Sequence, residues 1–140
     1  MTPEGGLTGP LRLEVEGHRV TRLVVDYAVA FEFQDVKEQY TIRIEGEFRI
    51  DQGGAESRCL LDHPSTLGAA TTLLHDQVRT AEARQSGELV LCLESGAVLR
   101  VAPAETIEAW EMFGSSGARV VCLPGGGLAV WSGTAARQPM

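Results

Sequence analysis

The chain has 140 residues, of which 44% are hydrophobic and 22% are charged. This length fits one ordinary domain and is enough to bury a core without disulfides or a structural metal. Nineteen acidic residues against twelve basic ones give a formal net charge of -7, which argues against nucleic acid as a partner because its binders neutralise phosphates with lysine and arginine. We therefore expect a single domain over 1–140, with an ordered core at about 11–131 and flexible ends at 1–10 and 132–140.

Neither a secretory signal nor a membrane span is evident. Residues 1–6 contain no basic segment followed by an apolar one, and the apolar runs are far shorter than the roughly 20 residues that cross a bilayer. The three cysteines, Cys59, Cys92 and Cys122, are an odd number that suits free thiols in a reducing compartment. These features predict a cytoplasmic location, and Cys92 and Cys122 lie in apolar patterns typical of a core.

Alternating hydrophobic and polar residues predict strands in the first part of the chain. A hairpin is expected to turn near Asp26–Tyr27, and the polar stretch 34–38 separates it from two further strands. The predicted strands cover Leu11–Val15, 20–26, 28–33, 40–45 and 48–50.

The middle of the chain changes character. Residues 52–57 are a loop by composition, 59–61 could add a short strand, and Pro64 begins an amphipathic helix that extends to Leu74. Strands then return, joined by turns at Ser86–Gly87 and Ser95–Gly96. A second short helix is expected at 105–113. The later predicted strands cover 78–84, 88–93, 97–101, 119–123 and 128–131.

This pattern contains a repeat. The segments 20–44 and 78–101 each predict a three-stranded antiparallel meander, with the helix at 64–74 between them. The predicted fold class is α+β: a mostly antiparallel sheet or half-open barrel built from two meander-like halves, with a second helical turn near the C-terminal end.

The sequence Glu108–Ala109–Trp110–Glu111, followed by Val121-Cys-Leu-Pro-Gly-Gly-Gly-Leu-Ala-Val-Trp131, resembles the C-terminal signature of a family of small bacterial proteins of unknown function that is common in actinobacteria. The resemblance extends over about 11–131. It implies a freestanding bacterial domain and supplies no activity, cofactor or catalytic residue.

The loop Pro124–Gly127 is the most unusual local feature. Successive glycines can point backbone N–H groups into a concave nest that binds anions, so Gly125, Gly126 and Gly127 are candidate ligand-binding residues. The alternative is a tight turn between the last two strands, for which glycine is also required. No Walker-type lysine follows the loop and no dinucleotide-binding pattern opens a helix, which favours the turn.

Cys59, Asp62, His63 and His75 are the ligand-type residues that lie near one another in the sequence. Their spacing matches no standard zinc pattern, and a closed set of cysteines and histidines would need a ligand from elsewhere. A histidine, including His18, could in principle act as base to a thiol, but no nucleophile motif is present. We therefore predict no metal, no cofactor and no catalytic residue.

The C-terminal part of the chain also carries acidic and aromatic residues. Glu105, Glu108 and Glu111 are spaced by three residues and would share one face of the predicted second helix beside Trp110. Such a row is commonly a solvated face, although paired carboxylates can also transfer protons. Together with Trp131, the set Glu108, Trp110 and Glu111 has the composition of a patch that binds a basic protein partner.

The sequence defines no biochemical activity, and two hypotheses of different class remain open. The first is a small acidic, non-enzymatic protein-binding module, immunity-like or accessory, whose charge would speed encounter with a basic protein. The alternative is a small-molecule or anion-binding domain, with or without enzymatic activity, centred on Gly125–Gly127. Neither needs nucleic acid or a membrane, and both allow a monomer or a homodimer.

Overall fold

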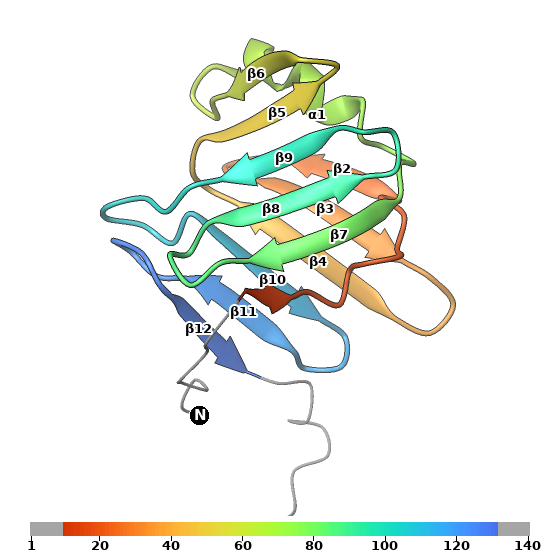
Figure 1. The fold of residues 1–140 in the computed structure, drawn as a ribbon, viewed down its shortest axis with the longest axis vertical. Helices are drawn as coiled ribbons and strands as arrows, with labels where there is room; N and C mark the ends of the chain where they lie inside the picture. The colour runs from red at the N-terminus through yellow and green to blue at the C-terminus, as the bar shows by residue number, and fades with distance from the viewer. Residues whose placement is uncertain (1–9, 132–140) are drawn as a thin grey trace, which may run out of the picture.

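The computed structural model describes residues 10–131, which form two antiparallel sheets of six strands that pack face to face (Figure 1). The first sheet, in front in Figure 1, has the strand order β1–β7–β8–β9–β5–β6. Its strands are β1 (Leu11–Arg12), β5 (Phe48–Gln52), β6 (Ala55–Cys59), β7 (Val78–Ala83), β8 (Leu89–Leu93) and β9 (Val98–Val101).

The second sheet lies behind the first and has the order β12–β11–β10–β4–β3–β2. Its strands are β2 (Arg22–Val25), β3 (Val29–Gln34), β4 (Gln39–Ile44), β10 (Trp110–Gly114), β11 (Arg119–Cys122) and β12 (Leu128–Trp131). The strands do not close into a barrel, and the fold is a sandwich of two sheets where a single sheet or a half-open barrel was predicted. The predicted mostly antiparallel architecture is confirmed.

Each half of the chain begins with the expected three-stranded meander, β2–β3–β4 in the second sheet and β7–β8–β9 in the first. Each half then sends its next hairpin to the opposite sheet. The β5–β6 hairpin extends the first sheet from β9, and β10–β11 extends the second sheet from β4. The strand order therefore repeats between the halves, and the exchange of hairpins ties the two sheets together.

The predicted second helix at 105–113 is wrong, because Trp110–Gly114 is strand β10. Trp110 and Met112 point into the core, whereas Glu111 and Phe113 point outward. This period of two matches a half-buried strand, and β4 supplies the hydrogen-bonded partner, with Trp110 opposite Ile44. Pairing between distant segments thus outweighs the local spacing of the glutamates, and the class is mostly β instead of α+β.

Two other local predictions also need correction. The segment predicted as a loop at 52–57 contains a hairpin turn at Gly53–Gly54 and most of β6. The predicted helix at 64–74 shrinks to a 3₁₀ turn, η1 (Pro64–Leu67), and a single turn of α-helix, α1 (Gly68–Thr71). The hydroxyls of Thr71 and Thr72 donate hydrogen bonds to carbonyls three residues earlier, a local competition that disfavours a longer helix.

The core fills the space between the two sheets. Phe31 of β3 and Phe48 of β5 meet edge to face across the sandwich, with ring centroids 6.4 Å apart, and each is 1% exposed. Cys59 and Cys122 are buried among these residues. The apolar faces of both sheets are therefore used in packing the core.

Within residues 10–131, no helix is both long enough and apolar enough to span a membrane.

The loops gather at two opposite ends of the sandwich, left and right in Figure 1. The left end contains the Ser86–Gly87 turn, the segment 102–109 and the loop 123–127. The right end contains the β3–β4 turn at Asp35–Glu38 and the loop that carries His18. We call these the glycine end and the histidine end.

Candidate functional site

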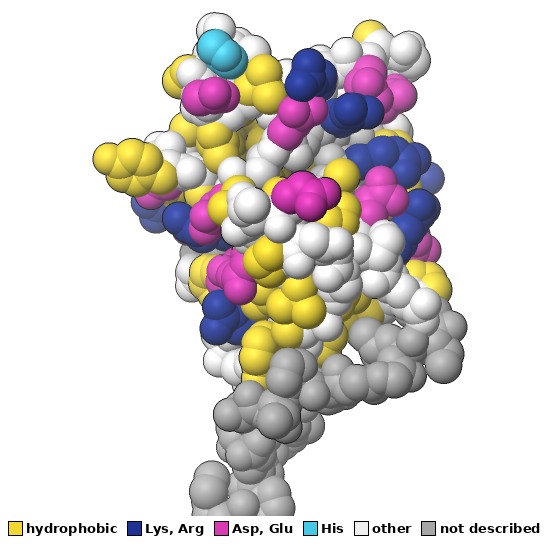
Figure 2. Space-filling model, turned by 90° about the vertical axis from the view of Figure 1, so that its left-hand side faces the viewer, with side chains coloured by type: hydrophobic (Ala, Val, Ile, Leu, Met, Phe, Trp, Pro, Cys, Tyr) yellow, Lys and Arg dark blue, Asp and Glu magenta, His cyan; other side chains and the backbone are white. Residues whose placement is uncertain are grey.

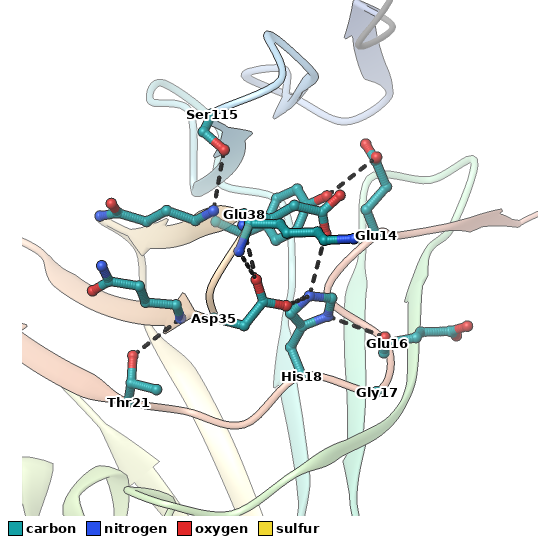
Figure 3. A network of polar contacts seen from close by, with 12 residues as sticks. Glu14, Glu16, Gly17, His18, Thr21, Asp35, Glu38 and Ser115 are labelled. Atoms are coloured by element: carbon teal, nitrogen blue, oxygen red, sulfur yellow. Dashed lines mark hydrogen bonds and ion pairs between the residues drawn. The ribbon is translucent and has the colours of Figure 1, made fainter.

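His18 lies at the histidine end, in the connection between β1 and β2. The backbone there is fixed against the start of β7, because Val78 N–H donates to the His18 carbonyl at 2.8 Å and Gly17 N–H donates to the Val78 carbonyl at 2.8 Å. Gly17 has a φ of +84°, a conformation that a residue with a Cβ rarely adopts. This turn directs the imidazole toward the β3–β4 hairpin (Figure 3).

Asp35 closes that hairpin. Its Oδ1 accepts hydrogen bonds from the backbone N–H groups of Lys37 and Glu38, both at 2.8 Å, and its own N–H donates to the Glu38 carbonyl at 2.9 Å. The sequence Asp-Val-Lys-Glu thus forms a turn capped by the aspartate side chain. Because Oδ1 is used in the turn, Oδ2 is the oxygen directed at His18.

The strand ends on both sides of this turn are also anchored. Thr21 Oγ1 accepts a hydrogen bond from Gln34 N–H at 3.1 Å, and Ser115 Oγ accepts one from Gln39 N–H at 3.1 Å. Figure 3 shows both contacts flanking the cluster. The hairpin is therefore held from two neighbouring segments, and its carboxylates are positioned before any ligand arrives.

Three side chains converge at this point. His18 Nε2 lies 3.1 Å from Asp35 Oδ2 and 3.5 Å from Glu38 Oε2. Nε2 is enclosed by protein and makes no hydrogen bond within the described residues, although both carboxylates lie within ion-pairing distance. We call His18, Asp35 and Glu38 the histidine cluster.

The other ring nitrogen has a different partner. His18 Nδ1 lies 3.3 Å from the Glu16 carbonyl oxygen, which can only accept a hydrogen bond. In the tautomer that donates from Nδ1 to this carbonyl, the Nε2 lone pair is available to a cation beside the two carboxylates. A cation bound at Nε2 would also be attracted by both carboxylates.

Further acidic and phenolic groups surround the cluster. The Tyr40 ring packs edge to face on the imidazole with centroids 5.3 Å apart, and its hydroxyl donates to Glu14 Oε2 at a long 3.5 Å. Burial raises the pKa of Tyr40 well above its ordinary value, and the carboxylates of Glu14 and Glu38 raise it further. Tyr40 therefore stays a neutral hydrogen-bond donor.

The two nearby acids with depressed pKa values are ionised at neutral pH. The amide N–H groups of Glu38 and Lys37 lower the pKa of Asp35, and His18 adds a smaller effect in the same direction. Burial acts to raise the pKa of Glu16, but hydrogen bonds from Arg12 and the Ala81 amide outweigh it and lower the pKa. Asp35 thus brings a negative charge to the cluster, whereas the charge of Glu16 is paired with Arg12.

A cavity adjoins two members of the histidine cluster. His18 and Asp35 line a cavity of about 460 Å³ together with Gly17, Thr21 and Gln34. The His18 side chain is 17% exposed, while Asp35 and Glu38 are 49% and 45% exposed. The imidazole is therefore fixed, whereas water can reach both carboxylates.

The glycine end shows the opposite arrangement. The three backbone N–H groups that could form an anion nest all donate to carbonyls of the chain: Gly125 to Ala104 at 2.7 Å, Gly126 to Leu123 at 2.9 Å and Gly127 to Ser86 at 2.9 Å. The φ angles of Gly125, Gly126 and Gly127 are +81°, +118° and +89°. This geometry does not support anion binding by the loop and favours its role as a turn that needs glycine.

The residues proposed for partner binding are divided between two faces. Trp110 is 1% exposed, and its indole N–H donates to the Gly87 carbonyl at 2.8 Å, so it belongs to the core and is not a surface anchor. Glu111 and Trp131 lie on the outer face and meet through Arg119, which is 3.6 Å from Glu111 Oε1 and 5.6 Å above the Trp131 ring. Glu108 lies in the loop that precedes β10.

The candidate zinc ligands Cys59, Asp62, His63 and His75 do not form a cluster. Cys59 is buried, whereas His63 and His75 are exposed. Among residues 10–131, the one group of three or more histidine, cysteine or acidic side chains with ligand atoms within 4.8 Å of one another is the histidine cluster. Sequence analysis missed it because His18 lies 17 positions before Asp35, and only the packing of two loops brings them together.

The fold and this site define an antiparallel β-sandwich with a preorganised histidine–carboxylate cluster at one end. The chain belongs to a family of unknown function (DUF6188), whose model matches residues 11–132. This agrees with the predicted resemblance to an uncharacterised family. No curated protein and no solved structure matches the chain.

Proposed function

We propose that this chain is a divalent-metal-binding domain with His18, Asp35 and Glu38 as its protein ligands. The observation that carries the proposal is the enclosed His18 Nε2, which makes no hydrogen bond while two carboxylate oxygens lie 3.1 Å and 3.5 Å away. A metal-binding histidine typically donates its other ring N–H to a carbonyl, and the Glu16 carbonyl occupies that position. Three protein ligands also leave coordination positions for water.

The donor set restricts the choice of metal. One imidazole nitrogen with two carboxylates is a mixed set, suited to Zn²⁺ and Mn²⁺ more than to Ca²⁺, which prefers six to eight oxygens. At such a site Zn²⁺ binds more tightly than Mn²⁺. Glu14 adds negative charge near the cluster and favours any cation without distinguishing among metals, whereas Glu16 is paired with Arg12.

Isothermal titration calorimetry of the EDTA-treated, dialysed chain tests the proposal. We expect one equivalent of Zn²⁺ to bind, Mn²⁺ to bind more weakly, and Ca²⁺ to bind weakest. Zn²⁺ at 100 times its dissociation constant should add about 2.7 kcal/mol to the free energy of unfolding. Absence of saturable Zn²⁺ binding would contradict the proposal.

Variants locate the site. Asp35→Asn keeps the Oδ1 acceptor of the turn but replaces the oxygen that faces His18, so it should fold and weaken Zn²⁺ binding at least tenfold. His18→Ala should abolish binding. His63→Ala is the matched control, because this exposed histidine makes no side-chain cap for η1, and it should leave the titration unchanged. An equal loss of Zn²⁺ binding in His63→Ala would contradict the assignment of His18 and Asp35 as metal ligands.

We also propose, as a second candidate, that the outer face of the second sheet binds a protein partner in a bacterial host, in an immunity-like or accessory role. Arg119 contacts both Glu111 and Trp131 there, and Phe113 beside them is 39% exposed. Arginine and aromatic side chains are enriched in protein interfaces. The net charge of -7 favours a basic partner.

A pull-down from the native host compares the wild-type chain with Phe113→Ser and Arg119→Ala. A specific partner should be recovered by the wild type and lost with both variants, whereas His63→Ala, on a different part of the surface, should retain it. Recovery of no protein above background, or equal recovery by every variant, would contradict this candidate.

A further inference from the structure

The outer face of the first sheet carries a row of arginines. The strand registers place Arg58 of β6 opposite Arg49 of β5, and Arg49 opposite Arg100 of β9. All three side chains are exposed. Figure 2 views the molecule from the left of Figure 1, so the first sheet lies along the right of that picture, where basic side chains gather.

A row of three arginines is unexpected in a chain with so few basic residues. Only 12 of 140 residues are basic and the net charge is -7, yet three arginines occupy directly opposed positions. Like charges opposite one another destabilise a sheet. Packing does not require arginine at these exposed positions, and only Arg58 has a close ion pair within the described residues, so folding does not explain Arg49 and Arg100.

The carboxylates near Arg49 and Arg100 pair mainly with two further arginines, Arg58 within the row and Arg84 outside it. Glu47 accepts two hydrogen bonds from Arg58, at 2.7 Å and 2.9 Å, and its nearest oxygen is 4.0 Å from Arg49 Nε. Arg100 makes no hydrogen bond or ion pair with any residue of the described range 10–131. Arg49 and Arg100 therefore carry charge that the chain itself leaves largely unneutralised.

A cavity of about 350 Å³ lies beside these two arginines. Arg49 and Arg100 line it together with Glu47, Glu88 and the segment 102–104. Glu88 accepts a hydrogen bond from Arg84 at 2.9 Å. Arg84 therefore neutralises the charge of Glu88, in the same way that Arg58 neutralises that of Glu47. The volume is at the lower end of the range for small-molecule sites.

The wall of this cavity is supported by the glycine loop. Gly125 N–H donates to the Ala104 carbonyl at 2.7 Å, which fixes the apolar segment Ala102–Pro103–Ala104 next to the arginines. The glycine loop thus uses its amides to shape a neighbouring cavity. One wall of the cavity is apolar, and the other carries two guanidinium groups.

We propose that Arg49 and Arg100 bind the phosphoryl group of a small organic phosphate, with its apolar part against Ala102–Ala104. Two guanidinium charges match a phosphate dianion better than a single carboxylate, and the planar donor fork of arginine suits phosphate oxygens. This site lies at the glycine end, away from the histidine cluster. It is independent of metal binding there.

Nuclear magnetic resonance of the EDTA-treated chain titrated with phenyl phosphate tests the proposal, with benzoate and inorganic phosphate as comparison probes. Saturable shifts should appear at the Nε–H groups of Arg49 and Arg100 and at the amides of 102 and 104. Phenyl phosphate should bind at least fivefold more tightly than either comparison probe. Equal binding of benzoate would overturn the choice of phosphate, and absence of saturation would overturn the site.

Arg49→Gln and Arg100→Gln should each weaken binding of phenyl phosphate at least tenfold. Arg79→Gln is the matched control, because Arg79 lies on β7 of the same sheet and pairs with Glu94 at 3.6 Å. Arg79→Gln also removes one positive charge, and its affinity for phenyl phosphate should stay within twofold of the wild-type value. Equal weakening by all three variants would show general attraction of anions and overturn the site.

Stability provides a second readout. Arg100→Gln removes a like charge from the row, so its thermal midpoint should equal or exceed that of the wild type. A clear loss of stability would mean that Arg100 serves the fold, which would overturn the argument that the row is maintained for a ligand.

Discussion

The glycine end and the histidine end of the sandwich satisfy their polar groups in different ways. At the glycine end, the amides of Gly125, Gly126 and Gly127 and the indole N–H of Trp110 all donate to backbone carbonyls. At the histidine end, His18 Nε2 is enclosed without a hydrogen bond beside two carboxylates. A loop whose donors are satisfied internally serves the fold, whereas an enclosed nitrogen without a hydrogen bond, beside two carboxylates, favours a bound ligand.

The largest effect should come from Trp110 at the glycine end. Trp110→Ala removes a side chain that is 1% exposed and hydrogen-bonded to the Gly87 carbonyl at 2.8 Å. The free energy of unfolding should fall by about 3–5 kcal/mol, measured by urea denaturation. A loss below about 1 kcal/mol would contradict the assignment of Trp110 to the core.

A smaller loss is expected for Gly126→Ala at the same end. Gly126 has a φ of +118°, and an added Cβ would lie 3.0 Å from the Ser86 carbonyl oxygen. Strain and contact together should lower the free energy of unfolding by about 1–3 kcal/mol. Gly53→Ala provides a comparison, since no atom lies within 4 Å of a Cβ added there. Gly126→Ala should be the more destabilising of the two.

At the histidine end, Asp35 should affect the pH dependence of stability. Its pKa is lowered by the amides of Glu38 and Lys37 and by His18, so its ionised form stabilises the native state. That contribution is present above the unfolded-state pKa of about 3.9 and is lost as the pH falls through the lower native value. The difference in stability between wild type and Asp35→Asn should shrink as the pH is lowered from 6 to 3. A constant difference would contradict the depressed pKa.

The last prediction concerns the reactivity of the three thiols and involves no change in the free energy of unfolding. Burial raises the pKa of Cys59, and it raises that of Cys122 at the glycine end despite a hydrogen bond from the Ala109 amide. Cys92 is partly exposed, contrary to the prediction that it lies in the core. Native chain treated with iodoacetamide should be labelled first at Cys92, and Cys59 and Cys122 should react only on unfolding. Faster labelling of Cys122 would contradict its burial.

The alternating strands of both meanders were predictable from the sequence because local periodicity determines them. The turns at Ser86–Gly87 and Ser95–Gly96 were predictable for the same reason, and both glycines have positive φ. Strand β10 was not, because the spacing of Glu105, Glu108 and Glu111 also fits a helix and only pairing with β4 decides the outcome. The predicted flexible ends, 1–10 and 132–140, lie outside the described residues apart from position 10.

The candidate sites were less predictable than the strands. His18 and Asp35 come from different loops, and their approach depends on how the β1–β2 connection packs against the β3–β4 turn. The arginine row depends on the strand order, since β5 lies next to β9 only after the exchange of hairpins between sheets. Period-two alternation does reveal that Arg49 and Arg100 face outward, but not that they are opposite each other.

The most direct test of metal binding is the ring ¹⁵N spectrum of chain labelled at histidine during a Zn²⁺ titration. The sequence contains three histidines, so each ring can be assigned with single variants. The account predicts that His18 Nε2 shifts to a metal-bound value at one equivalent while Nδ1 keeps its proton, and that His63 and His75 do not change. A His18 ring that stays unchanged in excess Zn²⁺, or equal shifts at all three histidines, would contradict it.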